Sequence, residues 1–182
     1  MNEIIFKTHS PEETARIAYQ IGEAVTQGTV ITLEGDLGAG KTTFTKGLAK
    51  GLGIERNVNS PTFTIIKEYK GRLPLYHMDV YRVEDAFEDL GFDEYFEGQG
   101  VTVVEWAHLI EDQLPSELLS MQILYVGENE RKIVLIPKGE RVHVSIAAAS
   151  ILARAAFLKE MYNLSKEVKV ELLKGAGAAV DR

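Results

Sequence analysis

Eight residues, Gly35 to Thr42, combine glycines with a lysine and a threonine at a spacing suited to binding phosphate. Their sequence, GDLGAGKT, fits the pattern G-x-x-x-x-G-K-[ST]. In such a loop the glycines let backbone N–H groups converge on an anion, and the following helix N-terminus adds positive dipole. Lys41 would reach the outer phosphates, and the Thr42 hydroxyl can ligate Mg²⁺. The pattern therefore predicts a P-loop; the competing interpretation is a glycine-rich turn that binds nothing.

A P-loop needs an acidic partner to hold the metal or its water, normally at the carboxyl end of a neighbouring strand. Two acids meet this description. Asp79 follows the run Leu75–Met78, and Glu105 follows the more uniformly apolar run Val101–Val104. Both are expected to act in the site, although a strand-end carboxylate can also serve only as a helix cap.

Hydroxyl and imidazole groups near these acids are harder to assign. Ser60 and Thr62 are plausible switch-loop hydroxyls near a γ-phosphate, yet an Asn-Ser-Pro-Thr turn explains them equally well. His77 has no second His or Cys at ligand spacing, so we interpret it as structural and not as a metal ligand. We take Lys41 to be a partly exposed loop residue.

The surrounding elements place the loop between a strand and a helix. Residues 29–33 form a β-branched run before it, and apolar residues recur at helical spacing after it, up to Gly51 or Gly53. An earlier helix should begin at Ser10, with Pro11 in its first turn. Several strands with few intervening helices predict an α/β fold with a mixed parallel and antiparallel sheet flanked by helices. The other expected strands cover residues 63–69, 75–81, 101–104, 121–126 and 132–136, with one or two short helices over 84–97.

Bulk composition limits the possible classes of function. The chain has 182 residues, 45% of them hydrophobic and 26% charged, as in a soluble globular protein. It has no apolar run long enough to span a bilayer and no secretory signal at its N-terminus, so we expect a cytoplasmic protein with no membrane partner. The absence of cysteine excludes disulfides and thiolate sites. A net charge of −7 argues against binding nucleic acid without a partner protein.

Five segments in order, GDLGAGKTTF, NVNSPTFTIIKEY, LYHMDVYR, LGFDEYF and VVEW, closely resemble the TsaE (YjeE) family over residues 1–140. This resemblance implies a P-loop NTPase fold and a cytoplasmic accessory ATPase, which hydrolyses ATP slowly with Mg²⁺. Its implied role is the threonylcarbamoyladenosine modification of tRNA. The implied partners are TsaB-like and TsaD-like subunits, with tRNA reached only through that complex.

The resemblance also implies roles for individual residues. Thr42 and Glu105 match the magnesium ligands, Asp79 matches the acid that positions water, and Thr62 matches the switch residue; Trp106 lies beside the metal acid. With Lys41, these acids and Thr62 form the expected catalytic set. The expected nucleotide-binding residues are Asp36, Leu37, Gly38, Ala39, Gly40, Lys41, Thr42 and Thr43.

Composition changes near residue 140, which predicts a P-loop ATPase domain over 1–140 and a helical C-terminal extension over 141–182. The extension resembles the C-terminal region of type 2 ribonucleases H, the HIII kind most of all. It lacks the upstream segments that build a nuclease centre, so we assign it no nuclease site. Its many apolar residues favour docking on its own domain or on a second copy, which makes self-association a possible outcome.

Two other classes of function share a P-loop. A small-molecule kinase would need a basic substrate pocket and an Arg-rich lid, whereas residues 84–97 are acidic. A non-catalytic scaffold would bind nucleotide only to stay folded. Measured turnover with and without partner subunits separates these classes.

Overall fold

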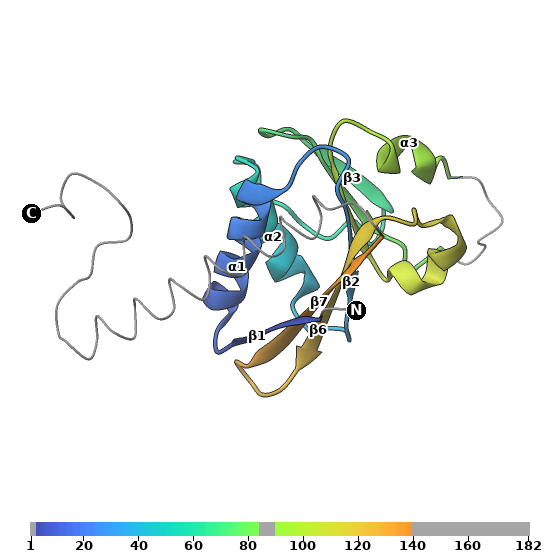
Figure 1. Ribbon diagram of the computed structural model, residues 1–182. Coiled ribbons are helices and arrows are strands. Elements are labelled where there is room, and N and C mark those ends of the chain that lie inside the picture. Colours follow the sequence, from blue (N-terminus) through green and yellow to red (C-terminus); the bar gives the residue numbers. More distant parts are fainter. Residues whose placement is uncertain (1–2, 84–89, 140–182) are drawn as a thin grey trace, which may run out of the picture.

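The computed structural model describes residues 3–83 and 90–139, and it places one twisted sheet between two layers of helices (Figure 1). Within these residues the strands follow the spatial order β1-β7-β6-β2-β5-β4-β3. The strands are β1 (Ile4–Thr8), β2 (Val30–Glu34), β3 (Ile66–Tyr69), β4 (Leu75–Asp79), β5 (Val101–Glu105), β6 (Leu118–Tyr125) and β7 (Arg131–Lys138). The helices are α1 (Pro11–Ala24), α2 (Lys41–Gly51), α3 (Phe92–Phe96) and the 3₁₀ helix η1 (Ala107–Gln113).

The sheet is mixed, as the sequence predicts. Strand β2 pairs in parallel with both β5 and β6, and β4 pairs in parallel with β5. The pairs β1–β7, β6–β7 and β3–β4 are antiparallel. Because β2 and β5 lie at the centre with helices over both faces, nearly all their residues are buried.

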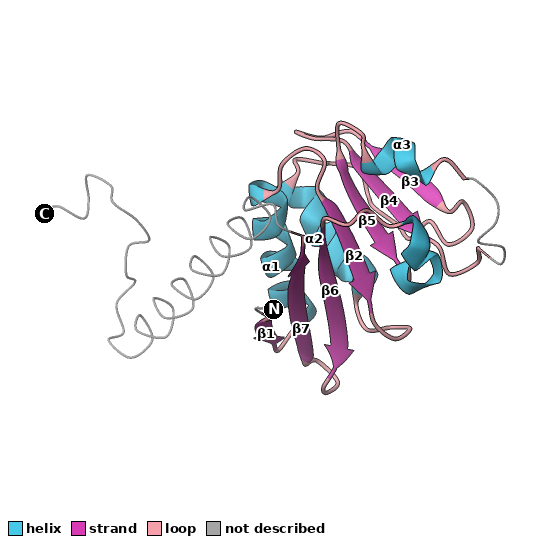
Figure 2. Ribbon diagram, turned by 45° about the vertical axis from the view of Figure 1, so that its right-hand side comes forward, coloured by secondary structure: helices cyan, strands magenta, loops and turns pink. Residues whose placement is uncertain are grey.

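Helices α1 and α2 cover one face of the sheet, and α3 and η1 lie against the other (Figure 2). The first face buries the larger core, in which Phe44 and Leu48 of α2 pack with Ile31 and Leu33 of β2. The second core is smaller and includes Phe92 and Ile110. Since alternate strand residues point to opposite faces, the sheet can build two separate cores.

Both ends of α1 are capped: the N-terminal end by a residue next to it in the sequence, and the C-terminal end by a side chain from a distant segment. Ser10 Oγ accepts a hydrogen bond from the backbone N–H of Glu13 at 3.1 Å, and Pro11 opens the helix, as predicted. At the other end the helix has no basic residue in its last turn. Arg72, from the β3–β4 turn, instead donates to the carbonyls of Gly22 and Val25 at 2.8 and 3.1 Å.

Two strand predictions were too long. Strand β3 begins at Ile66 because residues 62–65 form a turn, in which Ile65 has a positive φ of 62° and the Phe63 side chain is 85% exposed. Strand β4 ends at Asp79, two residues before Tyr81. Of the helices expected over 84–97, the structure contains α3, and residues 84–89 lie outside the described residues. The predicted extension over 141–182 also lies outside them, so the domain boundary stays a prediction.

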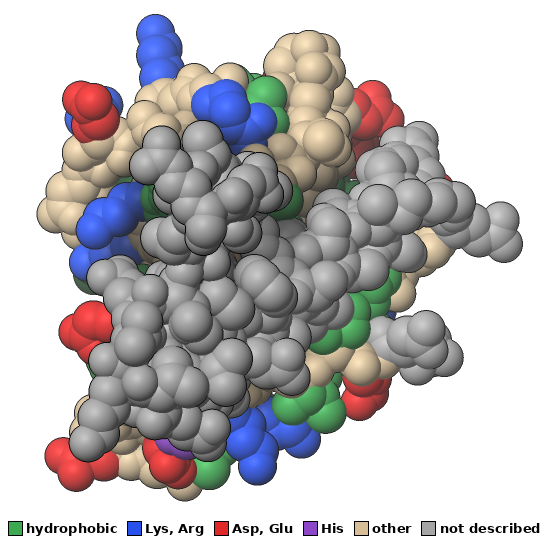
Figure 3. Space-filling model, turned by 60° about the vertical axis from the view of Figure 1, so that its left-hand side comes forward, with side chains coloured by type: hydrophobic (Ala, Val, Ile, Leu, Met, Phe, Trp, Pro, Cys, Tyr) green, Lys and Arg blue, Asp and Glu red, His purple; other side chains and the backbone are tan. Residues whose placement is uncertain are grey.

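Charged side chains of both signs occur around the rim of the face drawn in Figure 3, and no broad basic patch is visible there among the coloured residues. Among the described helices, none has both the length and the apolar character needed to cross a membrane.

Candidate nucleotide-binding site

The predicted P-loop joins the end of β2 to the start of α2. Its three glycines have positive φ angles of 147° at Gly35, 79° at Gly38 and 109° at Gly40, a region that other residues rarely adopt. A Cβ atom at Gly35 would also lie 2.4 Å from the carbonyl oxygen of Ile123. The glycine spacing is therefore required by the backbone path, which turns sharply from the sheet into the first turn of α2.

The loop residues differ in their exposure to solvent and in the groups that they offer to a ligand. Asp36, Leu37 and Gly38 are exposed, and the Leu37 side chain is 91% exposed. Ala39 is buried, and Gly40, Thr42 and Thr43 are half-buried. A bound anion would therefore meet Leu37 and Ala39 through backbone groups, whereas Lys41 and Thr42 offer functional side chains.

Lys41 is only 6% exposed, so the expectation of a partly exposed side chain was wrong. Its ammonium donates to the carbonyl oxygens of Gly35 and Asp36 at 2.6 and 3.1 Å, and it lies 3.9 Å from the centre of the Trp106 ring. Burial lowers the pKa of Lys41, although nearby carboxylates, Glu105 foremost, oppose this effect. The loop thus holds a desolvated cation that neutral dipoles and an aromatic face stabilise.

Asp79 and Glu105 lie side by side at the carboxyl ends of parallel strands. They are direct partners in the β4–β5 register, and each is 3% exposed. Strand β5 adjoins β2, so both acids lie at the edge of the sheet from which the P-loop emerges. The structure therefore brings together the acids and the lysine that the sequence places far apart.

The two acids have different partners. Asp79 Oδ2 accepts hydrogen bonds from the hydroxyls of Ser60 and Thr62 at 2.9 and 2.6 Å. Asp79 Oδ1 accepts from the backbone N–H of Tyr81 at 3.1 Å. The hydroxyls of Ser60 and Thr62, which the sequence suggested as switch-loop groups, are thus hydrogen-bonded to Asp79. This acid holds residues 60–62 against the sheet.

Glu105 pairs instead with His77, whose Nε2 lies 2.7 Å from Glu105 Oε1 in a fully buried contact. No hydrogen bond joins Glu105 Oε2 to any residue that the structure describes. Trp106 follows Glu105 with a positive φ of 63°, and its ring contacts Tyr81 at 4.9 Å between centroids. This backbone conformation turns the indole over Lys41.

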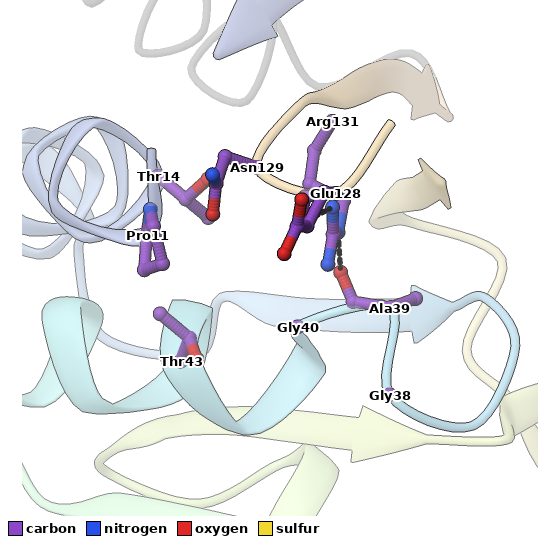
Figure 4. A pocket seen from close by; sticks show the side chains of 9 residues that line it. All are labelled: Pro11, Thr14, Gly38, Ala39, Gly40, Thr43, Glu128, Asn129 and Arg131. Carbon is purple, nitrogen blue, oxygen red and sulfur yellow. Dashed lines mark hydrogen bonds between the residues drawn. The ribbon is translucent and has the colours of Figure 1, made fainter. Parts of the chain in front are cut away.

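A cavity of about 90 Å³ flanks the P-loop beside the β6–β7 turn (Figure 4). In the sheet order, β6 and β2 lie between β7, which contributes Arg131 to the cavity, and the strands β5 and β4, which end on the two acids. The guanidinium of Arg131 donates through Nε to the Ala39 carbonyl oxygen at 2.8 Å, which fastens the β6–β7 turn to the loop. The cavity is lined by Pro11, Thr14, Gly38, Ala39, Gly40, Thr43, Glu128, Asn129 and Arg131. The sequence did not point to its non-loop residues, because they come from two distant segments with no shared motif.

The donor groups beside the loop fit Mg²⁺ better than a metal held entirely by protein. The described residues contain no cluster of three or more His, Cys, Asp or Glu side chains arranged to hold a metal. They do place the Thr42 hydroxyl in the first turn of α2 and leave Glu105 Oε2 without a hydrogen-bond partner among them. Mg²⁺ is usually bound by one or two oxygen ligands together with phosphates and waters.

A mixed sheet with a glycine-rich loop between β2 and α2 defines an α/β protein of the P-loop NTPase fold. Comparison with known proteins gives the family. The model of the family described as "Threonylcarbamoyl adenosine biosynthesis protein TsaE" matches residues 8–133. The chain belongs to the TsaE family, whose members are tRNA threonylcarbamoyladenosine biosynthesis proteins.

Individual relatives agree with this assignment. The TsaE protein of Bacillus subtilis is 63% identical over 142 residues, which cover 78% of this chain and 90% of the relative. That of Treponema pallidum is 43% identical over 131 residues, covering 70% and 96%. The crystal structure of YdiB from Bacillus subtilis superimposes with a TM-score of 0.73 at 53% identity, covering 82% of this chain and 94% of that one.

A second family model, described as "Ribonuclease HII", matches residues 99–182. This match is consistent with the resemblance seen in the C-terminal sequence. It overlaps the TsaE match over residues 99–133, which in the structure form β5, η1, β6 and part of β7. These elements are integral to the sheet that carries the P-loop.

Proposed function

We propose that this protein binds ATP with Mg²⁺ at the P-loop and hydrolyses it slowly, as an accessory ATPase in the threonylcarbamoyladenosine modification of tRNA. The observation that carries the proposal is the buried Lys41 ammonium, held by loop carbonyls next to two strand-end carboxylates. A lysine in the first turn of a helix, after a glycine-rich loop whose backbone N–H groups can converge on an anion, favours binding of a phosphate, and the adjacent carboxylates favour a Mg²⁺ ion bound with it. The proposal includes TsaB-like and TsaD-like partner subunits, with tRNA contacted only through that complex.

Each side chain has a role in this proposal. Lys41 and the amides of residues 36–43 hold the phosphates, and Thr42 and Glu105 hold the metal. Mg²⁺ would neutralise charge on the phosphate oxygens. Asp79, with Thr62 attached to it, would position the attacking water and link the switch loop to the nucleotide. The nucleoside would extend toward the cavity beside Arg131, since this cavity borders the P-loop.

The test is ATP turnover by the full chain, alone and with TsaB-like and TsaD-like subunits. Slow basal turnover that rises when the partners are added supports the proposal. Turnover that instead requires a small-molecule phosphoryl acceptor identifies a kinase, and nucleotide binding without turnover under any condition identifies a scaffold. Lys41→Met should reduce nucleotide affinity at least about tenfold, whereas Lys50→Met, at an exposed position at the far end of α2, should leave it unchanged.

A further inference from the structure

A buried histidine, His77, lies beside Glu105, and the proposed function assigns it no role. His77 lies in the middle of β4 and is 0% exposed. It is two residues before Asp79, so it points to the same face of the sheet as Asp79 and Glu105. From there it reaches across to the neighbouring strand, where its Nε2 is 2.7 Å from Glu105 Oε1.

The chemistry of the pair fixes the direction of this hydrogen bond. An ionised carboxylate can only accept hydrogen bonds, so His77 carries a hydrogen on Nε2 and donates a hydrogen bond to Glu105 Oε1. The other ring nitrogen, Nδ1, is buried and has no hydrogen-bond partner among the described residues. A buried polar atom without a partner costs free energy, and an apolar side chain would fill the same space without that cost. Within the described part of the chain, the hydrogen bond to Glu105 is therefore the interaction that an apolar side chain in the place of His77 would not make.

We propose that His77 is a positioning residue for the metal-binding carboxylate of Glu105, an inference that depends on the proposed Mg²⁺-nucleotide site. The hydrogen bond holds Oε1 against the imidazole and keeps Oε2 available as a ligand. Asp79 differs, because both its oxygens already accept hydrogen bonds from Thr62, Ser60 or the backbone of Tyr81. Without His77, the Glu105 carboxylate could turn toward the Lys41 ammonium, which its charge already influences. Such a turn would weaken metal binding and leave the phosphate-binding loop in place.

The experiment measures binding of a fluorescent ATP analogue, labelled on the ribose, in EDTA and across a Mg²⁺ titration. His77→Phe keeps a ring of similar size and removes the donor, and His77→Gln restores a side-chain N–H. Val103→Ala is the packing control, since Val103 is the register partner of His77 on β5 and is fully buried. If His77→Phe does not fold, as judged by thermal melting, His77→Leu takes its place.

We expect the Mg²⁺ concentration at half-effect to rise about tenfold in the Phe variant, the lower end of what loss of a hydrogen bond to a metal ligand costs. Affinity for the analogue in EDTA should not change, and the Gln variant should lie closer to the wild type. Val103→Ala should lower the melting temperature without moving the Mg²⁺ midpoint. An unchanged midpoint in a folded His77→Phe or His77→Leu protein overturns the inference, and so does an equal shift in Val103→Ala. Failure of the wild type to bind the analogue at all is a different result, which refutes the proposed function itself.

Discussion

Gly47 lies where α1 and α2 approach each other closely, and its substitution by alanine tests how rigidly the P-loop helix is held. An alanine Cβ there would lie 2.4 Å from the Ala15 carbonyl oxygen and 2.9 Å from the Ala15 Cα. An ordinary contact is at least 3.4 Å, so the helices must separate by about 1 Å to accept the methyl group. The nearest atoms belong to the α1 backbone, which cannot move aside as a flexible side chain would.

Two opposing effects set the expected magnitude for Gly47→Ala. Alanine favours a helix interior over glycine by about 1 kcal/mol. Overpacking a close contact costs about 1–3 kcal/mol, and a backbone obstacle places this site at the upper end. We therefore expect the free energy of unfolding to fall by about 2 kcal/mol, since the steric cost exceeds the gain in helix propensity.

Urea denaturation followed by far-UV circular dichroism measures the change. The matched control is Lys46→Ala, one residue earlier in α2, where the side chain is exposed and the free energy of unfolding should change by less than about 0.5 kcal/mol. A Gly47→Ala protein as stable as the wild type, or more stable, would refute the reasoning. It would mean that α1 moves without cost and does not fix the position of α2.

The other predictions concern the nucleotide-binding site, the C-terminal end of α1 and the residues after 140. Lys41→Met should reduce nucleotide affinity at least about tenfold, or ~1.4 kcal/mol, by isothermal titration calorimetry; unchanged affinity would exclude the assigned role. Because burial lowers the pKa of Lys41, the folded wild type should gain free energy of unfolding relative to Lys41→Met as pH rises from that lowered pKa to the ordinary lysine value. Parallel urea titrations of both proteins check this, and a constant difference across pH would contradict it. Glu105→Ala should weaken Mg²⁺-dependent binding whereas Asp79→Ala should mainly lower turnover, and equal effects on Mg²⁺ affinity would refute the division. Arg72→Ala should lower the free energy of unfolding by about 1–3 kcal/mol in urea titrations, because two carbonyls at the end of α1 lose a charged donor; no change would show that water replaces it. A chain ending at residue 140 should keep its nucleotide affinity in the same calorimetric assay, and loss of binding by a folded truncated protein would place part of the site beyond that residue.

The sequence alone determined the features that depend on neighbouring residues. The P-loop could be predicted because its glycines, Lys41 and Thr42 are contiguous, and backbone geometry requires their order. The N-terminal cap of α1 at Ser10 is equally local. The pairing of Asp79 with Glu105 could also be anticipated, since carboxyl ends of adjacent parallel strands meet at one edge of a sheet. Their catalytic roles stay predictions.

Only the tertiary structure decided the interactions between segments far apart in the chain. The strand expected to begin at Phe63 begins at Ile66, because residues 62–65 form a turn, and hydrogen bonds from Ser60 and Thr62 to Asp79 hold the start of this turn against the sheet, a contact that no local propensity encodes. Burial of Lys41 depends on Trp106, which comes from a different strand end. The bond from His77 to Glu105 likewise depends on strand register, in which a shift of one residue would turn the histidine to the other face of the sheet. Local sequence specifies backbone conformation, whereas packing across the sheet specifies which side chains meet.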